Sequence, residues 1–204
     1  MQFFDNEKVV EERIFKTFYA SIVAMLGLGI LGLIVHPFVV QDNSKDILGT
    51  KISQAQLEDY LVLSADYLNS YSVSEHGARD LSALSSDAAR LGVIESSYAV
   101  LTKYDEISGR SYVHQYISRY PKENMNQVFD SASVDWDSKL NGAKKQTIQL
   151  GDRAAMYSAK TPDYGNIRVI IFVEKDIYVS IVVLGADSDK STGNDTATII
   201  SARI

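Results

Sequence analysis

Residues 17–35 form one uninterrupted apolar run near the N-terminus, TFYASIVAMLGLGILGLIV, without a single charged side chain. A helix rises about 1.5 Å per residue, so a run of this length spans roughly the 30 Å hydrocarbon core of a bilayer. The run predicts a single transmembrane helix. It divides the chain into a cytoplasmic tail at 1–16, a membrane anchor at 17–40, a stalk at 41–56 and one extracytoplasmic domain at 57–204.

The sequence around the run indicates an anchor that is not cleaved. A signal peptide has a shorter apolar region followed by a small-x-small site, whereas this run leaves through Val35-His36-Pro37-Phe38. Lys8, Arg13 and Lys16 precede it, which favours a cytoplasmic N-terminus. We therefore expect a single-pass protein of the cell membrane whose C-terminal domain is extracytoplasmic.

Small residues within the anchor would let another helix approach closely. The residues concerned are Ala20, Ala24, Gly27, Gly29 and Gly32. The alternative is that Gly and Ala are simply common in membrane-spanning helices. On the first interpretation, the partners are the lipid bilayer and other integral membrane subunits.

Composition narrows the function of the domain. The chain carries a net charge of −6, of which −5 falls in residues 41–204, and nucleic-acid binding needs concentrated positive charge instead. No cysteine is present, so disulfides, thiolate nucleophiles and cysteine-bound metals are excluded. A cysteine-free domain outside the membrane favours a prokaryotic cell surface. We expect no nucleic-acid partner.

Hydrophobic patterning predicts strands and helices in alternation from residue 57 onward. The expected elements are a short strand near Tyr71, a helix or ordered loop at 75–92, a hairpin at 98–120, a helix at 121–135, a polar crossing at 135–146, strands at 153–158, 168–174 and 177–184, and a helix at 196–204. The predicted fold class is therefore α+β, an antiparallel sheet with packed helices that follows one N-terminal transmembrane helix.

Several short segments carry a family resemblance. They are Asp66-Tyr67-Leu68, the Leu-Gly-Asp-Arg-Ala segment at 150–154, the valine-rich hairpin at 169–184 and the closing Ala-Arg-Ile. With these segments the chain resembles prokaryotic, in several cases archaeal, membrane-anchored extracytoplasmic proteins with a PsbP-like α+β domain. The resemblance implies a PsbP-like fold and a binding, assembly or accessory role, and no catalytic residues carry over from it.

One strand offers a candidate ligand face. Alternation over 112–120 puts Tyr112, His114 and Tyr116 on the same side. Aromatic side chains at this spacing suit apolar or sugar ligands. The alternative is a packed or half-exposed sheet face without a ligand. No histidine pair, nucleophile motif or phosphate loop accompanies them, so we expect no catalytic residue, metal or cofactor and no enzymatic activity.

A polar loop near the C-terminus contains four side chains that could bind a cation: Asp187, Asp189, Asn194 and Asp195. Their spacing lacks the glycine and glutamate of an EF-hand, which favours a solvated loop and a helix cap. Asn194 also begins an Asn-Asp-Thr glycosylation acceptor, although it could instead serve only as the cap.

Two functions remain open at this point. The first is a non-enzymatic accessory or assembly subunit of a membrane protein complex, acting through its helix and its extracytoplasmic domain. The alternative is a tethered extracytoplasmic module that binds a small molecule or a surface ligand, with Tyr112, His114 and Tyr116 or the groove beside the 121–135 helix as its site.

Overall fold

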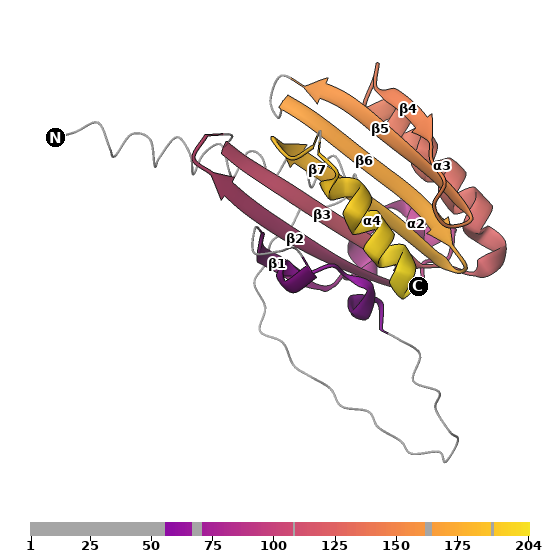
Figure 1. The fold of residues 1–204 in the computed structure, drawn as a ribbon. Helices are drawn as coiled ribbons and strands as arrows, with labels where there is room; N and C mark the ends of the chain where they lie inside the picture. Colours follow the sequence, from indigo (N-terminus) through magenta and orange to yellow (C-terminus); the bar gives the residue numbers. More distant parts are fainter. Residues whose placement is uncertain (1–55, 67–70, 108, 162–164, 189) are drawn as a thin grey trace, which may run out of the picture. The chain divides into compact units, whose positions relative to one another are not determined.

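The structure is a computed structural model, and it describes residues 56–66, 71–107, 109–161, 165–188 and 190–204. Seven strands dominate this part of the chain (Figure 1). All strands belong to one antiparallel sheet with the order β1-β2-β3-β7-β6-β5-β4. Their bounds are β1 Ser72–Ala78, β2 Glu95–Asp105, β3 Gly109–Arg119, β4 Lys144–Thr147, β5 Arg153–Thr161, β6 Gly165–Glu174 and β7 Ile177–Gly185.

Few helices accompany the sheet. They are the α-helices α2 Ser86–Arg90, α3 Met125–Lys139 and α4 Thr192–Arg203, and the 3-10 helices η1 Leu57–Tyr60, η2 Ser64–Asp66, η3 Leu81–Ala83 and η4 Lys122–Asn124. The sheet and the long helices lie within one compact unit, Ala55–Ser82 with Ser86–Ile204. The chain has a second compact unit, and Ala83–Ser85 are grouped with that unit.

Two hairpins form the centre of the sheet. In the first, β2 and β3 pair from Glu95↔Arg119 to Asp105↔Gly109. In the second, β6 and β7 are joined by Lys175-Asp176, with Lys175 at a φ of 56°. Strand β7 then pairs with β3, so the second hairpin closes against the first. Both hairpins were predicted from the alternation and the β-branched residues of the sequence, and both are confirmed.

Cross-strand pairing defines the two faces of the sheet. The pairs Tyr157↔Val169, Val169↔Val182 and Val182↔His114 put one row of side chains on the same face. Helix α3 lies on this face, because the Tyr157 hydroxyl donates to the carbonyl oxygen of Ser133 in α3 at 3.4 Å. Helix α4 packs on β6 and β7 from the opposite face and crosses the front of the sheet in Figure 1.

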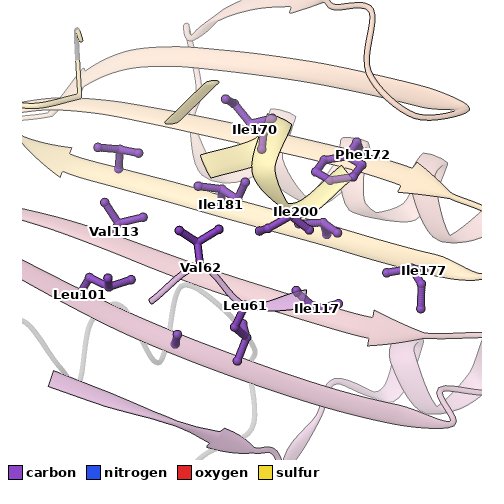
Figure 2. Packing of buried hydrophobic residues seen from close by; sticks show 14 of the residues in the cluster. Leu61, Val62, Leu101, Val113, Ile117, Ile170, Phe172, Ile177, Ile181 and Ile200 are labelled. Atoms are coloured by element: carbon purple, nitrogen blue, oxygen red, sulfur yellow. The ribbon is translucent and has the colours of Figure 1, made fainter. Parts of the chain in front are cut away.

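The main hydrophobic core lies on the face covered by α4 and η1, which we call the core face. Figure 2 shows its side chains converging from β2, β3, β6, β7, α4 and the segment around Leu61. Its fully buried members include Leu101, Ile117, Phe172 and Ile200. Burying one such side chain contributes about 1.5–3 kcal/mol, so this cluster is the main source of stability.

Residues 57–66 include η1 and η2 and run across the core face; we call them the strap. The Gln115 side chain receives the Val62 N–H at 2.9 Å and donates to the Val62 carbonyl at 2.7 Å, so it pairs with both backbone groups of one residue. Arg203 of α4 donates to the Leu61 carbonyl at 2.6 Å. The strap is thus held by a strand below it and a helix beside it.

The expected α+β class is wrong, because the described residues form mainly one seven-stranded antiparallel sheet. Strands β1 and β4 account for much of the difference. Strand β4 replaces part of the expected polar crossing, and all four of its residues are exposed. It is held by pairing with β5, so its sequence carries no alternation of apolar and polar residues.

The expected transmembrane helix falls outside the described residues. No helix in the part of the chain that the structure describes is both long and apolar enough to cross a membrane. The anchor at 17–40 is not described, and neither are its small residues Ala20, Ala24, Gly27, Gly29 and Gly32.

Candidate functional site

Strand β3 carries the three side chains that the sequence singled out. Val113 and Ile117 point into the cluster on the core face, so alternation puts Tyr112, His114 and Tyr116 on the opposite face. The imidazole of His114 and the ring of Tyr112 are tilted by 41° with their centroids 6.3 Å apart. The structure thus brings the three candidates together on one strand.

Neighbouring strands complete this surface. Tyr98 of β2 pairs directly with Tyr116, and its hydroxyl donates a short hydrogen bond to the Glu75 carboxylate of β1. The Arg79 guanidinium lies 5.1 Å from the centre of the Tyr116 ring, at cation–π distance. We call this surface the tyrosine face, made of Glu75, Arg79, Tyr98, Tyr112, His114 and Tyr116.

Charge on the tyrosine face is partly desolvated. Burial lowers the pKa of Arg79, while the neighbouring Tyr116 acts in the opposite direction. A guanidinium stays protonated throughout the physiological range in either case. Glu75 brings the opposite charge to the same surface, so the face presents one cation and one anion among its aromatic rings.

His114 lies at the centre of the tyrosine face and is 5% exposed. Burial lowers its pKa to about 4, while the charge of Glu75 acts in the opposite direction, so the imidazole is neutral at pH 7. Within the described residues, neither Nδ1 nor Nε2 has a hydrogen-bond partner. A neutral imidazole has one donor and one acceptor, and leaving either unpaired in a buried site costs about 1–3 kcal/mol.

The two ends of this face differ in how they are covered. Helix α3 packs over β5, β6 and β7. In the described part of the chain, extensive helix packing on this face is confined to those three strands, and η1 packs on β2 and β3 from the core face. Tyr98, Tyr112 and Tyr116 are accordingly half-buried. The tyrosine face is a partly exposed aromatic surface beside α3.

Asp187 behaves differently from the solvated residue that the sequence predicted. It is 2% exposed and accepts hydrogen bonds from Tyr71 at 2.7 Å and Lys103 at 3.0 Å, while Lys190 forms an ion pair with it at 2.7 Å. Burial alone would raise the pKa of Asp187, but the bonds from Lys190, Tyr71 and Lys103 outweigh it and lower the pKa to about 2.

This network has a structural role. The backbone N–H of Asp187 also binds the Ser111 hydroxyl at 3.1 Å, so the loop after β7 is tied to the first residues of the β3 pairing. Among the residues that the structure describes, no group of three or more His, Cys, Asp or Glu side chains could hold a metal ion. Asp189 of the same loop is not among the described residues.

Asn194 lies in the first turn of α4 and is exposed. The N-cap position belongs to Ser191, so the interpretation of Asn194 as the cap is wrong. Thr196, the third residue of the acceptor sequence, is fully buried, and its hydroxyl donates to the Thr192 carbonyl at 2.7 Å. Glycosylation at Asn194 stays a prediction, and in the folded chain the acceptor is wound into a helix.

Three residues of the tyrosine face were missed at the level of sequence: Tyr98 on the paired strand β2, and Glu75 and Arg79. Glu75 and Arg79 fall in the segment 75–92, for which a helix or ordered loop was expected, whereas β1 continues to Ala78. The register of β1 shifts between Val73 and Glu75, which interrupts any alternation. Only the pairing with β2 reveals that these two side chains join the tyrosines.

Comparison with known proteins adds no relative. No family model, no curated protein and no solved structure matches this sequence. The family resemblance given above therefore stays a prediction.

Proposed function

We propose that this protein is a non-enzymatic accessory subunit of a membrane protein complex, and that its tyrosine face contacts a partner protein. The carrying observation is the combination of half-buried tyrosines with Arg79 on strands that α3 leaves uncovered. Tyrosine and arginine are the residues most enriched among the energetic centres of protein interfaces. The tyrosine ring offers a large contact area with only two side-chain torsions to immobilise, and the arginine adds a planar charged group.

The apolar run at 17–35 supports the membrane part of the proposal. In this arrangement the anchor holds the domain at the extracytoplasmic surface and also packs against helices of the partner. The strap is the first part of the described chain, so a tether formed by the preceding residues would join the sheet there. Bonds to Gln115 and Arg203 hold the strap on the sheet and on α4.

The tyrosines also favour a protein partner by their arrangement. Tyr98 and Tyr116 are directly opposed on neighbouring strands, so their rings form a continuous patch. Glu75 and Arg79 lie at the edge of this patch, where charged groups set the orientation of a partner more than its affinity. A partner that fits this patch has an apolar centre and complementary charges around it.

Extraction of the full chain in mild detergent, followed by native electrophoresis and mass spectrometry, tests the proposal. We expect stoichiometric migration with integral membrane proteins, and loss of the complex when Tyr98 and Tyr116 are both changed to serine. The matched control is Val134→Ser on α3, which removes an exposed apolar side chain elsewhere. Migration of the wild-type chain alone would contradict the proposal.

A second candidate function, a tethered module for a small hydroxyl-bearing ligand, is favoured by one observation. Both ring nitrogens of His114 lack partners among the described residues, so one ligand hydroxyl could donate to the unprotonated nitrogen and a second could accept from the protonated one. We would titrate hydroxyl-bearing compounds against the chain carrying ¹⁵N-labelled histidine. A shift of the His114 resonances, absent for the exposed His76, would support this function over the first.

A further inference from the structure

The β2–β3 hairpin extends beyond both of its neighbours in the sheet. Pairing with β1 ends at Thr102, and pairing with β7 ends at Ser111. The two strands nevertheless stay paired to Asp105↔Gly109. The described residues from Tyr104 onward, which we call the hairpin tip (Tyr104–Ile107, Gly109 and Arg110), therefore form a two-stranded projection (Figure 1).

The hairpin tip carries the two most exposed large hydrophobic side chains among the described residues. Ile107 is 99% exposed and Tyr104 is 70% exposed. Single exposed apolar residues are ordinary on protein surfaces. Two of them lie on one projection, and one of them is almost wholly in solvent, so this part of the described surface exposes more apolar area than an isolated side chain does.

The base of the hairpin tip is held by several contacts with the loop after β7. Lys103 and Ser111, which flank it, both bind Asp187. Gly185 packs so closely on the strand that a Cβ atom there would lie 2.2 Å from the Arg110 carbonyl oxygen. A surface that is already held in place loses little conformational entropy when it binds.

Charge and position distinguish between a lipid and a protein as the occupant. Asp105 and Glu106, both exposed, directly precede Ile107 and outnumber Arg110, the exposed cation of the hairpin tip. An excess of carboxylates is repelled by an anionic bilayer surface. The N-terminal end of the described chain lies at the end of β2 opposite to the hairpin tip, where the Leu57 N–H binds the Glu95 carboxylate at 3.3 Å. Eleven residues of β2 separate the two ends, about 35 Å of extended strand.

We propose that the hairpin tip is a second docking site, where a protein partner receives Ile107 in an apolar pocket rimmed by basic side chains. The basic rim complements Asp105 and Glu106, and Tyr104 adds aromatic area beside the pocket. The inference rests on the proposed function only in assuming that a protein partner exists. It uses residues that do not belong to the tyrosine face, so either site can fail alone.

Site-specific photo-crosslinking of the full chain in its native membranes tests the proposal. A benzophenone amino acid replaces Ile107 in one variant and Val134, which is 69% exposed, in the control variant. We expect one discrete protein adduct from position 107 that position 134 does not give. Adducts to lipid alone, to a second copy of this chain, to the same proteins as the control, or to nothing would overturn it.

Binding to the identified partner then gives the quantitative result. Ile107→Ser should weaken the affinity at least about thirtyfold, since an anchor residue at the centre of an interface is worth about 2 kcal/mol or more and each 1.4 kcal/mol is about tenfold in affinity. Val134→Ser should leave the affinity unchanged. Both side chains are exposed, so neither variant threatens folding. An unchanged affinity for Ile107→Ser would also overturn the docking site.

The outcomes separate this site from the tyrosine face. If Ile107→Ser leaves the complex intact while the double Tyr98 and Tyr116 variant loses it, the proposed function stands and the tip proposal fails. If neither variant affects a complex, or no complex is found, the proposed function fails as well.

Discussion

The two central hairpins of the sheet differ in what covers them. The β6–β7 hairpin lies between α3 on one face and α4 on the other, and every residue from Val169 to Val173 is buried. The β2–β3 hairpin is packed on the core face by η1, while its other face carries the half-exposed tyrosines. The same strand pairing therefore gives a stable centre in one hairpin and an accessible surface in the other.

The ends of the two hairpins differ in the same sense. At the β6–β7 turn, the Lys175 N–H binds the Asp152 carboxylate at 2.9 Å, and the Asp176 carbonyl accepts the Tyr120 N–H at 3.0 Å. The β2–β3 end instead projects past its neighbours and exposes Ile107. The β6–β7 turn is bound by other parts of the fold, whereas the β2–β3 end is available to a partner.

The largest expected effect comes from opening a cavity on the core face of the β6–β7 hairpin. Phe172 is fully buried, so Phe172→Ala should lower the free energy of unfolding by about 4 kcal/mol. Tyr112→Ala on the β2–β3 hairpin should cost about 1 kcal/mol, because that ring is only partly buried. Urea denaturation of the two variants measures both. Equal losses would refute the contrast between the hairpins.

The next largest effect lies at the base of the hairpin tip. Asp187→Asn leaves the buried ends of Tyr71 and Lys103 without their carboxylate, and we expect a loss of about 3 kcal/mol. Asp176→Asn, at the other hairpin turn, removes a half-exposed ion pair with Arg119 and should cost less than about 1 kcal/mol. Thermal and chemical unfolding of both variants compares the two ends directly.

The pH dependence of the Asp187 network has a definite sign. Its folded-state pKa of about 2 lies below the ordinary 3.8 of an aspartate, so its contribution to stability is complete above the ordinary value. That contribution should disappear as the pH falls through 2. A wild-type chain that already loses it near pH 5, relative to Asp187→Asn, would show that the carboxylate is not held as the structure has it.

A smaller effect tests the core face of the β2–β3 hairpin. Gln115→Leu leaves the N–H and carbonyl of Val62 without their partner, and we expect a cost of about 2 to 3 kcal/mol. Amide exchange should accelerate in the strap before it does in β6 and β7. Gln146→Leu on the exposed strand β4 is the matched control and should leave both quantities unchanged. Uniform acceleration over the sheet would contradict a separately opening strap.

The extent to which each face is buried explains both why the two hairpins differ and why the sequence predicted them. Segments buried on both faces have dense runs of β-branched residues, as in β6 and β7, and a segment whose second face is only partly buried alternates, as in β3. Strands β1 and β4 have neither pattern, because neighbouring strands rather than burial hold them. Only a short strand near Tyr71 was expected where β1 lies, and no strand was expected where β4 lies, so the extent of the sheet was underestimated and the α+β class was wrong.

The candidate site divides in the same way. Tyr112, His114 and Tyr116 belong to one strand, so alternation alone put them on one face. Glu75 joins them through the pairing of β1 with β2, which no local sequence pattern predicts. Asp187 looked like a loop residue because the residues around it are polar, and its partner Tyr71 is 116 positions away in the sequence. Local periodicity reaches along one element, whereas long-range pairing decides the rest.

Acid should act on the tyrosine face through His114. Its pKa falls from 6.5 in the unfolded chain to about 4 in the folded one, because burial penalises the charged form. Between these two values the unfolded chain binds more protons, so stability falls as the pH is lowered through this window and changes no further below it. Between pH 7 and pH 5 the loss should be about 2 kcal/mol.

Comparing the wild type with His114→Phe over the same pH range isolates this loss, and His76→Gln, which removes an exposed histidine, should change nothing. If the wild type and His114→Phe lose stability equally, the imidazole takes up its proton in the folded chain at an ordinary pH. Water or a counter-charge would then reach the centre of the tyrosine face. That result would make the contrast with the β6–β7 hairpin larger than burial suggests, and it would favour a ligand that enters the face over a partner that only covers it.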